Sequence, residues 1–179
     1  MRIEAIEAFL LKLPLKKPYH LSIGEIRHFD TIVILIHGNG HTGRGETTPL
    51  KGYSRESVED VWKHVQYLGK TGAGKSVHEA KSLVDLCSSF SPFAAAGVMT
   101  ALEELEGLEI LNPPAQKAEV EISGILNETT MDGIEKAVPA LLDAGYRTIK
   151  FKVGFNVQED IEKVRFIQTL LKARAQLRL

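Results

Sequence analysis

The chain has 179 residues, of which 44% are hydrophobic, 25% are charged and 7% are aromatic, and its 22 Lys and Arg side chains nearly balance its 23 Asp and Glu side chains. This composition argues against intrinsic disorder, a collagen-like repeat and a polybasic nucleic-acid binder, because each of these classes needs a strong bias. No apolar run approaches the roughly 18 residues that span a bilayer. The sequence therefore predicts a cytoplasmic protein without a nucleic-acid or membrane partner, long enough for one domain and part of a second.

The first predicted elements are strands. An alternating apolar segment is followed by Pro14 and Pro18, which indicates an edge strand that runs into a loop. A β-branched apolar segment and a Gly-Asn-Gly turn at residues 38–40 then lead into another strand. The strands of this three-stranded meander are expected at residues 2–13, 30–37 and 42–47.

Three helices are predicted after the strands, from apolar residues at helical spacing. Ser54 is expected to cap the first helix, with Glu56 in its first turn. Cys87 is the only cysteine and lies on the apolar face of the second helix, so we expect a buried structural thiol. Asn-Pro-Pro at residues 112–114 predicts a linker. The helices are expected within residues 58–68, 77–90 and 92–108, which makes residues 1–112 an α+β domain.

The pattern changes after the linker, where strands and helices alternate. Short connections between alternating strands and helices predict parallel strands joined by right-handed crossovers. Residues 115–179 are therefore expected to begin an α/β sheet or barrel. Strands are predicted at residues 120–126 and 148–153, helices at residues 132–144 and 157–173, and the start of a third strand at residues 177–179.

Residues 69–76 (Gly-Lys-Thr-Gly-Ala-Gly-Lys-Ser) match the P-loop that cradles nucleotide phosphates. A P-loop follows a buried strand, whereas the residues before this segment have helical periodicity. We therefore favour a glycine-rich link between two helices, with Gly69 ending the first helix and Ser76 capping the second. A P-loop nucleotide-binding protein remains the alternative.

Lys-Phe-Lys-Val-Gly at residues 150–154 is the second candidate site. In a strand, Lys150 and Lys152 point to the same side, about 6 to 7 Å apart by strand rise. Two neighbouring ammonium groups repel, so one of them is expected to lose its proton more easily than a free lysine and to act as a general base. The alternative is a solvent-facing pair on an edge strand.

His37 and His41 have a spacing that suits metal ligands on a helix. They flank the predicted Gly-Asn-Gly turn, where this spacing gives them no shared face. We therefore predict no metal site at these histidines.

The lysine motif, with Ala-Gly-Tyr-Arg at residues 144–147, resembles the lysine motif of the mandelate racemase and muconate lactonising branch of the enolase superfamily. Gly-Arg-Gly-Glu-Thr-Thr-Pro at residues 43–49 resembles the glycine-glutamate turn of that family's N-terminal domain, and residues 94–107 stand where its last capping-domain helix lies. The resemblance spans nearly the whole chain in order. It implies an α+β capping domain followed by the first βα units of an incomplete (β/α) TIM-type barrel.

This resemblance implies a racemase, epimerase, cycloisomerase or dehydrating synthase, that is, an isomerase or a lyase. Such enzymes abstract the proton alpha to a carboxylate and stabilise the enediolate with Mg²⁺. Carried over, Lys152 is the base, and Lys150 is the neighbour that eases its deprotonation and touches the substrate carboxylate. The family's two substrate-selecting loops correspond to residues 15–28 and 47–55. Candidate substrate contacts are therefore Tyr19, His20, Ile23 and Tyr53, and packing of the loops is the alternative for each.

The resemblance also indicates where the metal ligands of such an enzyme are expected. In this family a third strand like residues 176–179 is followed at once by an Asp, the first of three carboxylate metal ligands, so the Mg²⁺ ligands are expected beyond residue 179. We therefore expect this chain alone to be inactive, and the full-length form to be a homo-oligomer that binds a small carboxylate substrate. A truncated interaction module without catalysis is the non-enzyme alternative.

Overall fold

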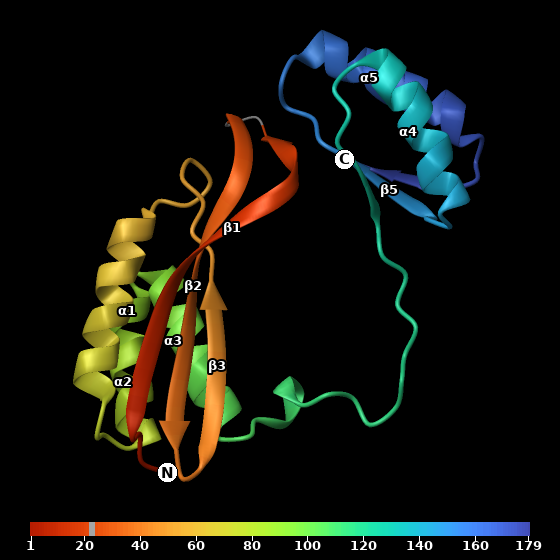
Figure 1. Ribbon diagram of the computed structural model, residues 1–179. Helices are drawn as coiled ribbons and strands as arrows, with labels where there is room; N and C mark the ends of the chain where they lie inside the picture. Colours follow the sequence, from red (N-terminus) through yellow and green to blue (C-terminus); the bar gives the residue numbers. More distant parts are fainter. Residues whose placement is uncertain (22–23) are drawn as a thin grey trace. The chain divides into compact units, whose positions relative to one another are not determined.

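The structure is a computed structural model that describes residues 1–21 and 24–179. It contains two compact units, each with its own hydrophobic core. The first unit comprises Met1–Lys17 and Arg27–Ala115, and the second comprises Pro18–Ile26 and Gln116–Leu179. These segments can be located in Figure 1 by the colour of their residue numbers. The early segment Pro18–Ile26 therefore belongs with the second half of the chain.

The first unit is built on a three-stranded sheet in the order β1-β2-β3. β2 and β3 pair antiparallel, and the turn between them places Asn39 and Gly40 at φ values of 52° and 75°, as a two-residue hairpin turn requires. The predicted meander is confirmed. Its strands are β1 (Ala5–Leu21), β2 (Gly24–Gly38) and β3 (His41–Thr47).

The predicted loop after residue 13 is wrong, because β1 continues through Pro14 and Pro18 to Leu21. β1 is an edge strand, and there a proline can lack its N–H without removing a hydrogen bond that the sheet needs. The loop expected at residues 15–28 is accordingly strand throughout its described part.

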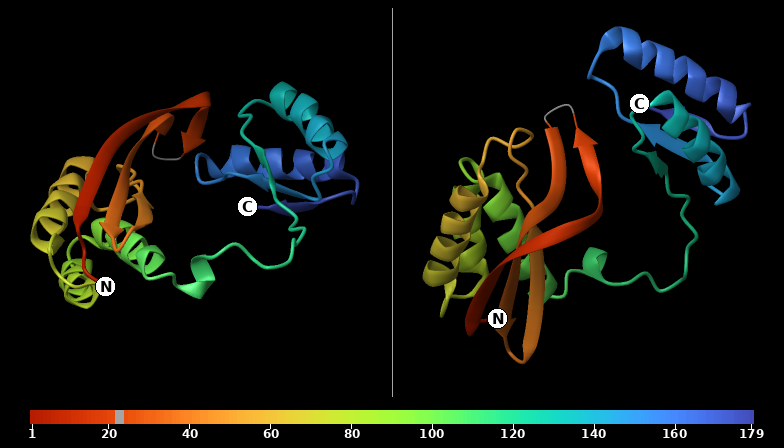
Figure 2. Two further views of the ribbon diagram at one scale, coloured as in Figure 1. Left: turned by 60° about the horizontal axis from the view of Figure 1, so that its bottom comes forward. Right: turned by 45° about the horizontal axis from the view of Figure 1, so that its top comes forward.

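Three helices cover one face of this sheet (Figure 2). They are α1 (Val58–Gly72), α2 (Val77–Ser88) and α3 (Pro92–Leu105), and the one-turn helix η1 (Glu109–Leu111) follows. Cys87 is buried as predicted, and burial raises the pKa of its thiol, which suits a structural cysteine. Buried side chains shared by sheet and helices include Ile32, Ile34, Ile36, Val61, Val65, Val84, Val98 and Leu102.

The two glycines within β3 are explained by the contact of this strand with α3. A Cβ atom at Gly43 would lie 1.9 Å from the carbonyl oxygen of Ala101, and one at Gly45 would lie 1.9 Å from that of Gly97. Any side chain at either position would push the helix off the sheet. The two glycines therefore allow β3 and α3 to touch backbone to backbone.

The start of α1 differs from the prediction. Ser57, not Ser54, caps the helix, and the Ser54 hydroxyl instead lies within hydrogen-bond distance of two backbone carbonyl oxygens, that of Leu50 at 3.1 Å and that of Glu56 at 2.9 Å. Glu56 lies before the helix, and its carboxylate accepts hydrogen bonds from the Ser91 hydroxyl and, at 3.0 Å, from the Phe93 N–H. Glu56 therefore binds the start of α3 rather than lying in the first turn of α1.

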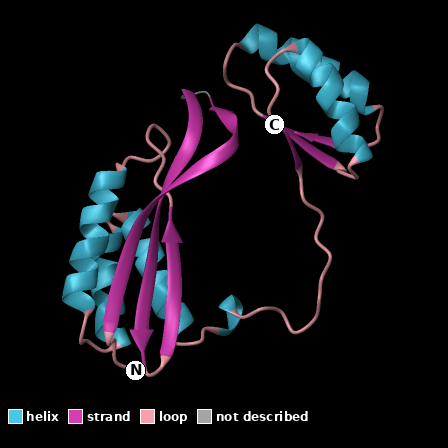
Figure 3. Ribbon diagram, viewed as in Figure 1, coloured by secondary structure: helices cyan, strands magenta, loops and turns pink. Residues whose placement is uncertain are grey.

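The second unit contains three parallel strands in the order β4-β5-β6, with both of its helices on one face (Figure 3). Spatial order equals chain order, as in consecutive βα units. The strand predicted at residues 120–126 is shorter than expected, and no helix of the described residues is long and apolar enough to cross a membrane. The elements are β4 (Gly124–Leu126), α4 (Met131–Asp143), β5 (Thr148–Phe151), α5 (Val157–Leu171) and β6 (Gln176–Arg178).

Candidate active site

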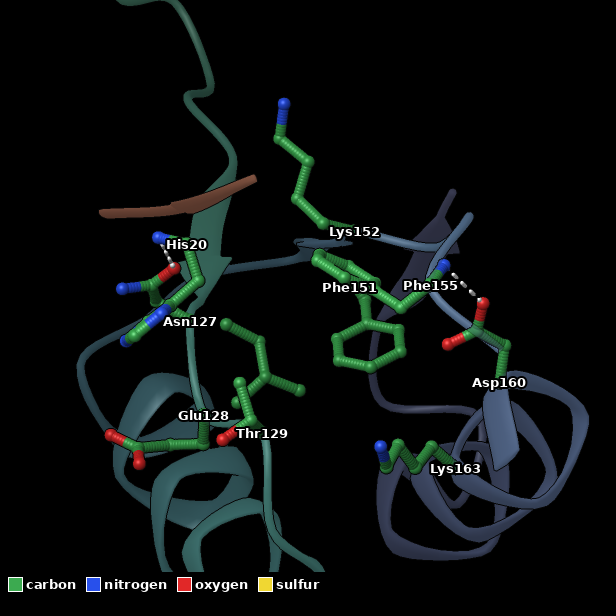
Figure 4. A pocket seen from close by; sticks show the side chains of 10 residues that line it. His20, Asn127, Glu128, Thr129, Phe151, Lys152, Phe155, Asp160 and Lys163 are labelled. Atoms are coloured by element: carbon green, nitrogen blue, oxygen red, sulfur yellow. Dashed lines mark hydrogen bonds between the residues drawn. The ribbon is translucent and has the colours of Figure 1, made fainter. Parts of the chain in front are cut away.

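The side chains of β5 alternate between the core and the opposite face of the sheet. Ile149 and Phe151 are 0% and 5% exposed and lie in the core that the helices cover. Because successive side chains of a strand point to opposite faces, Lys150 lies on the face that the helices leave open. Figure 4 shows the Lys152 ammonium group pointing away from the Phe151 ring. The two lysines therefore stand at the carboxyl end of the middle strand, and both are half-buried.

The neighbouring strands add one cation and one apolar side chain to this open face. Lys150 pairs in register with Ile125 of β4 and with Arg178 of β6. Side chains paired in register share a face, so the Arg178 side chain leaves the sheet on the same face as Lys150. Ile125 is 53% exposed on the same face. The open face is thus positively charged, with chemistry suited to an anionic ligand such as a carboxylate.

Two of the four candidate substrate contacts lie close to this site. Lys152 Nζ is 5.5 Å from the centroid of the Tyr19 ring, within the range of a cation–π contact. The His20 N–H donates to Asn127 Oδ1 at 3.4 Å, and Asn127 Nδ2 donates to the Pro18 carbonyl at 2.8 Å. The structure therefore brings Tyr19 and His20 to the carboxyl ends of β4 and β5.

The other two candidates do not belong to the described part of the second unit. Tyr53 belongs to the first unit, in the turn after β3, and its side chain is 82% exposed. Ile23 lies outside the described residues. A role in substrate contact stays a prediction for both.

A pocket of about 200 Å³ opens at the carboxyl ends of β4 and β5 (Figure 4). The Phe151 ring points into it, whereas the Lys152 ammonium group points away. Lys152 nevertheless belongs to the pocket lining, so the pocket adjoins this lysine as well as the Phe151 ring. Its polar lining residues include His20, Asn127, Glu128, Asp160 and Lys163.

Asp160, which the sequence analysis missed, fixes the backbone that follows Lys152. It lies in the first turn of α5, is 7% exposed, and its Oδ2 accepts hydrogen bonds from the N–H groups of Gly154 at 2.8 Å and Phe155 at 3.0 Å. Gly154 adopts a φ of 104°, which favours glycine. The sequence signal was present, since an acidic residue in a first helical turn after a glycine is placed to accept such bonds.

The P-loop match folds as the last turn of α1, a short connecting turn and the N-cap of α2. α1 extends to Gly72, so the prediction that Gly69 ends the helix is wrong, while the predicted Ser76 cap of α2 is confirmed. The Glu79 carboxylate accepts hydrogen bonds from the Ser76 N–H at 2.8 Å and from its hydroxyl at 2.7 Å. A carboxylate therefore binds the Ser76 hydroxyl that a P-loop would offer to magnesium, and the helix α1 stands where a P-loop has a strand.

The described residues do not by themselves fit a Mg²⁺ ion. No three side chains of His, Cys, Asp or Glu within residues 1–21 and 24–179 gather closely enough to hold a metal. His37 is engaged across the first sheet, with Nε2 3.0 Å from Glu7 Oε2 and Nδ1 2.9 Å from Thr42 Oγ1. We therefore derive no chemical step through a metal from these residues.

Comparison with curated proteins finds racemases, epimerases and a cycloisomerase, although no family model matches the chain. The N-succinyl-L-Arg/Lys racemase of Bacillus cereus is 24% identical over 94% of this chain and 48% of its own length. The D-Ala-D/L-Ala epimerase of Cytophaga hutchinsonii is 26% identical over 94% of this chain and 48% of its own length. The chloromuconate cycloisomerase of Cupriavidus pinatubonensis is 24% identical over 100% of this chain and 52% of its own length. The chain thus spans about half the length of the curated relatives that it matches.

Solved structures show the same fold. The dipeptide epimerase of Enterococcus faecalis V583, complexed with Mg and the dipeptide L-Leu-L-Tyr, superposes with a TM-score of 0.85 at 23% identity, over 99% of this chain and 52% of that one. The muconate lactonizing enzyme of Pseudomonas fluorescens has a TM-score of 0.83 at 23% identity, over 98% and 51%. The curated relatives are racemases, epimerases and a cycloisomerase of the mandelate racemase and muconate lactonising branch of the enolase superfamily, and the chain is similar to them in sequence and shares the fold of the solved structures.

Proposed function

We propose that the chain supplies the α+β capping domain and the first βα units of an isomerase that abstracts the proton alpha to a carboxylate. The observation that carries this proposal is the pair of lysines at the carboxyl end of β5, with Lys150 on its open face and Lys152 directly after it, where α/β barrels place their catalytic groups. The homology to racemases and epimerases supports the same class of reaction.

In this proposal Lys152 is the base. Its amine takes the alpha proton of the substrate, and a second acid on the opposite face, outside the described residues, would return a proton to the other side of the same carbon and so invert the centre. Lys150 and the in-register Arg178 provide positive charge where the substrate carboxylate binds. Tyr19, within 5.5 Å of Lys152 Nζ, forms a wall of the same site.

We propose a dipeptide or an N-acylated amino acid as the substrate. The names of the relatives support this class, since they include dipeptide epimerases and an N-succinylamino acid racemase. Several solved neighbours hold Mg together with a dipeptide, so we also propose that the active enzyme uses Mg²⁺. A divalent ion would supply charge stabilisation for the enediolate, with ligands from outside the described residues.

We further propose that turnover requires barrel strands beyond the three described here, and that the 179-residue chain alone is inactive. A (β/α)₈ barrel usually takes about 250 residues by itself. A homo-oligomeric, cytoplasmic enzyme stays a prediction.

The test is proton exchange in D₂O. The longest natural form of the chain and the 179-residue chain are each incubated with dipeptides and N-acylated amino acids in the presence of Mg²⁺. Deuterium at the alpha carbon, read by mass spectrometry, is expected for the longest form only. Exchange by neither form across the panel would contradict the proposed reaction, and exchange by the 179-residue chain would contradict its predicted inactivity.

A further inference from the structure

We propose that Asn127 is a positioning residue that holds residues 18–20 beside the end of β4, and so places the Tyr19 ring over Lys152. This inference rests on the proposed function in one respect only, the assignment of Lys152 as the base. Asn127 directly follows β4, is half-buried, and belongs to the same compact unit as residues 18–20.

The side-chain amide of Asn127 binds two backbone groups on either side of Tyr19. Its Nδ2 donates to the Pro18 carbonyl at 2.8 Å, and its Oδ1 accepts from the His20 N–H at 3.4 Å. In an extended chain the carbonyl of one residue and the N–H of the second residue after it point to the same side. One planar amide can therefore bridge both, as the peptide group of a paired strand does.

This arrangement requires an amide side chain. Asparagine presents a donor and an acceptor in one plane, whereas aspartate offers only acceptors and would place a negative charge against the Pro18 carbonyl. The Pro18 and His20 groups lie 109 and 107 residues from Asn127 in the sequence, so no local interaction replaces these bonds. Because residues 18–20 end an edge strand, their outward backbone groups are available for such pairing.

Fixing both neighbours of Tyr19 fixes the direction of its ring. The ring centroid lies 5.5 Å from Lys152 Nζ, and the long lysine stem would otherwise sample many rotamers. Asn127 thus acts on Lys152 through Tyr19, without touching the ammonium group itself in Figure 4. Its proposed contribution is to restrict where the base stands.

The test uses the isotopically labelled 179-residue chain without substrate or metal. Hydrogen exchange of the His20 amide and nuclear Overhauser contacts between the Tyr19 ring and the Lys152 ε-methylene are compared in wild type, Asn127→Ala and Asn127→Asp. Asn112→Ala removes an exposed amide elsewhere and serves as the matched control.

We expect Asn127→Ala to speed exchange of the His20 amide by about tenfold or more and to abolish the contact between Tyr19 and Lys152. Asn127→Asp should also lose that contact while keeping part of the His20 protection, and Asn112→Ala should change neither. Unchanged exchange at the α4 and α5 amides shows that the variants fold. A contact between Tyr19 and Lys152 that survives Asn127→Ala in a folded chain would overturn the proposal.

The failure of this proposal and the failure of the proposed function are distinguishable. In the longest natural form, Asn127→Ala is expected to lower kcat by about tenfold with a displaced pH profile, and Lys152→Ala to abolish turnover. Full activity of Lys152→Ala would refute the base assignment and leave the Asn127 contact standing. Loss of the Tyr19 contact in Asn127→Ala with kcat and pH profile unchanged would refute the positioning role alone.

Discussion

Both sheets of this molecule carry helices on one face. They differ in the residues that matter most: glycines at the contact with a helix in the first unit, and lysines away from the helices in the second. In the first unit β3 meets α3 through Gly43 and Gly45, with backbone against backbone and no space for a Cβ atom. In the second unit the helices cover only one face of β5, Lys150 lies on the other face, and Lys152 directly follows the strand. Close packing thus characterises the first unit, whereas the second presents charged groups on an open face. In the proposed function the first unit therefore has a supporting role, and the second unit carries the chemistry.

The largest effect on this comparison is expected at the contact between β3 and α3. Gly45→Ala places a Cβ atom against the Gly97 carbonyl, so α3 must move, at a cost of about 1 to 3 kcal/mol or more in the free energy of unfolding. Urea denaturation of the first unit measures it.

Gly69→Ala, within α1, is the matched control. A Cβ atom at this position would meet only the Ile6 side chain, at an ordinary contact distance of 3.4 Å. It should leave stability unchanged or raise it by about 0.5 to 1 kcal/mol, because alanine favours a helix over glycine. Equal stability of Gly45→Ala and wild type would show that the close packing of the first unit is not required.

A smaller, local effect is expected in the second unit at Asp160. Asp160→Ala leaves the N–H groups of Gly154 and Phe155 without their acceptor, at a cost of about 1 to 3 kcal/mol. Asp160→Asn keeps an oxygen that can accept both bonds and should cost less. Amide hydrogen exchange at residues 154 and 155 is the measurement, and unchanged exchange in Asp160→Ala would show that this carboxylate does not hold the turn after Lys152.

Sequence reasoning recovered what depends on neighbours along the chain. The hairpin at Asn39, the Ser76 cap and the burial of Cys87 all follow from local pattern and were predicted. It failed where a distant segment decides. Pro14 and Pro18 continue β1 only because that strand lies at the edge of its sheet, and Ser57 replaces Ser54 as the cap while Glu56 binds the start of α3.

The candidate site shows the same division. Strand alternation is enough to place Lys150 and Lys152, because a period of two is a local property. Asn127 has no such signal, since its partner carbonyl lies 109 residues away, and only the folded chain brings the two together. Asp160 lies between these cases, within six residues of the groups it binds.

A pH-dependent effect of smaller size is expected in the first unit at the start of α2. The pKa of Glu79 lies below its ordinary value, chiefly because the Ser76 hydroxyl donates to its carboxylate. A lowered pKa stabilises the fold above the unfolded-state pKa, and this contribution is lost as the pH falls through the folded-state value. Ser76→Ala should raise the pKa of Glu79 toward its ordinary value, as NMR titration measures. A pKa that does not move would contradict the capping role.

The last prediction is that residues 69–76, the P-loop match, do not bind nucleotide. Because residues 69–72 belong to α1 and the Glu79 carboxylate binds Ser76, we expect no binding of ATP with Mg²⁺ tighter than about millimolar. Calorimetry measures this, with Lys75→Ala as the comparison. Micromolar binding that Lys75→Ala abolishes would move a ligand site into the first unit and reverse the comparison between the units.

The central claim is that Lys152, directly after β5, removes the proton alpha to a carboxylate. The most direct measurement is deuterium incorporation at the substrate alpha carbon by the longest natural form of the chain, with Lys152→Ala and Lys150→Ala assayed beside it. The account predicts that Lys152→Ala loses exchange by about 10² to 10⁴ or more, while Lys150→Ala keeps a weaker activity with a displaced pH optimum. Full exchange by the Lys152→Ala protein would contradict it.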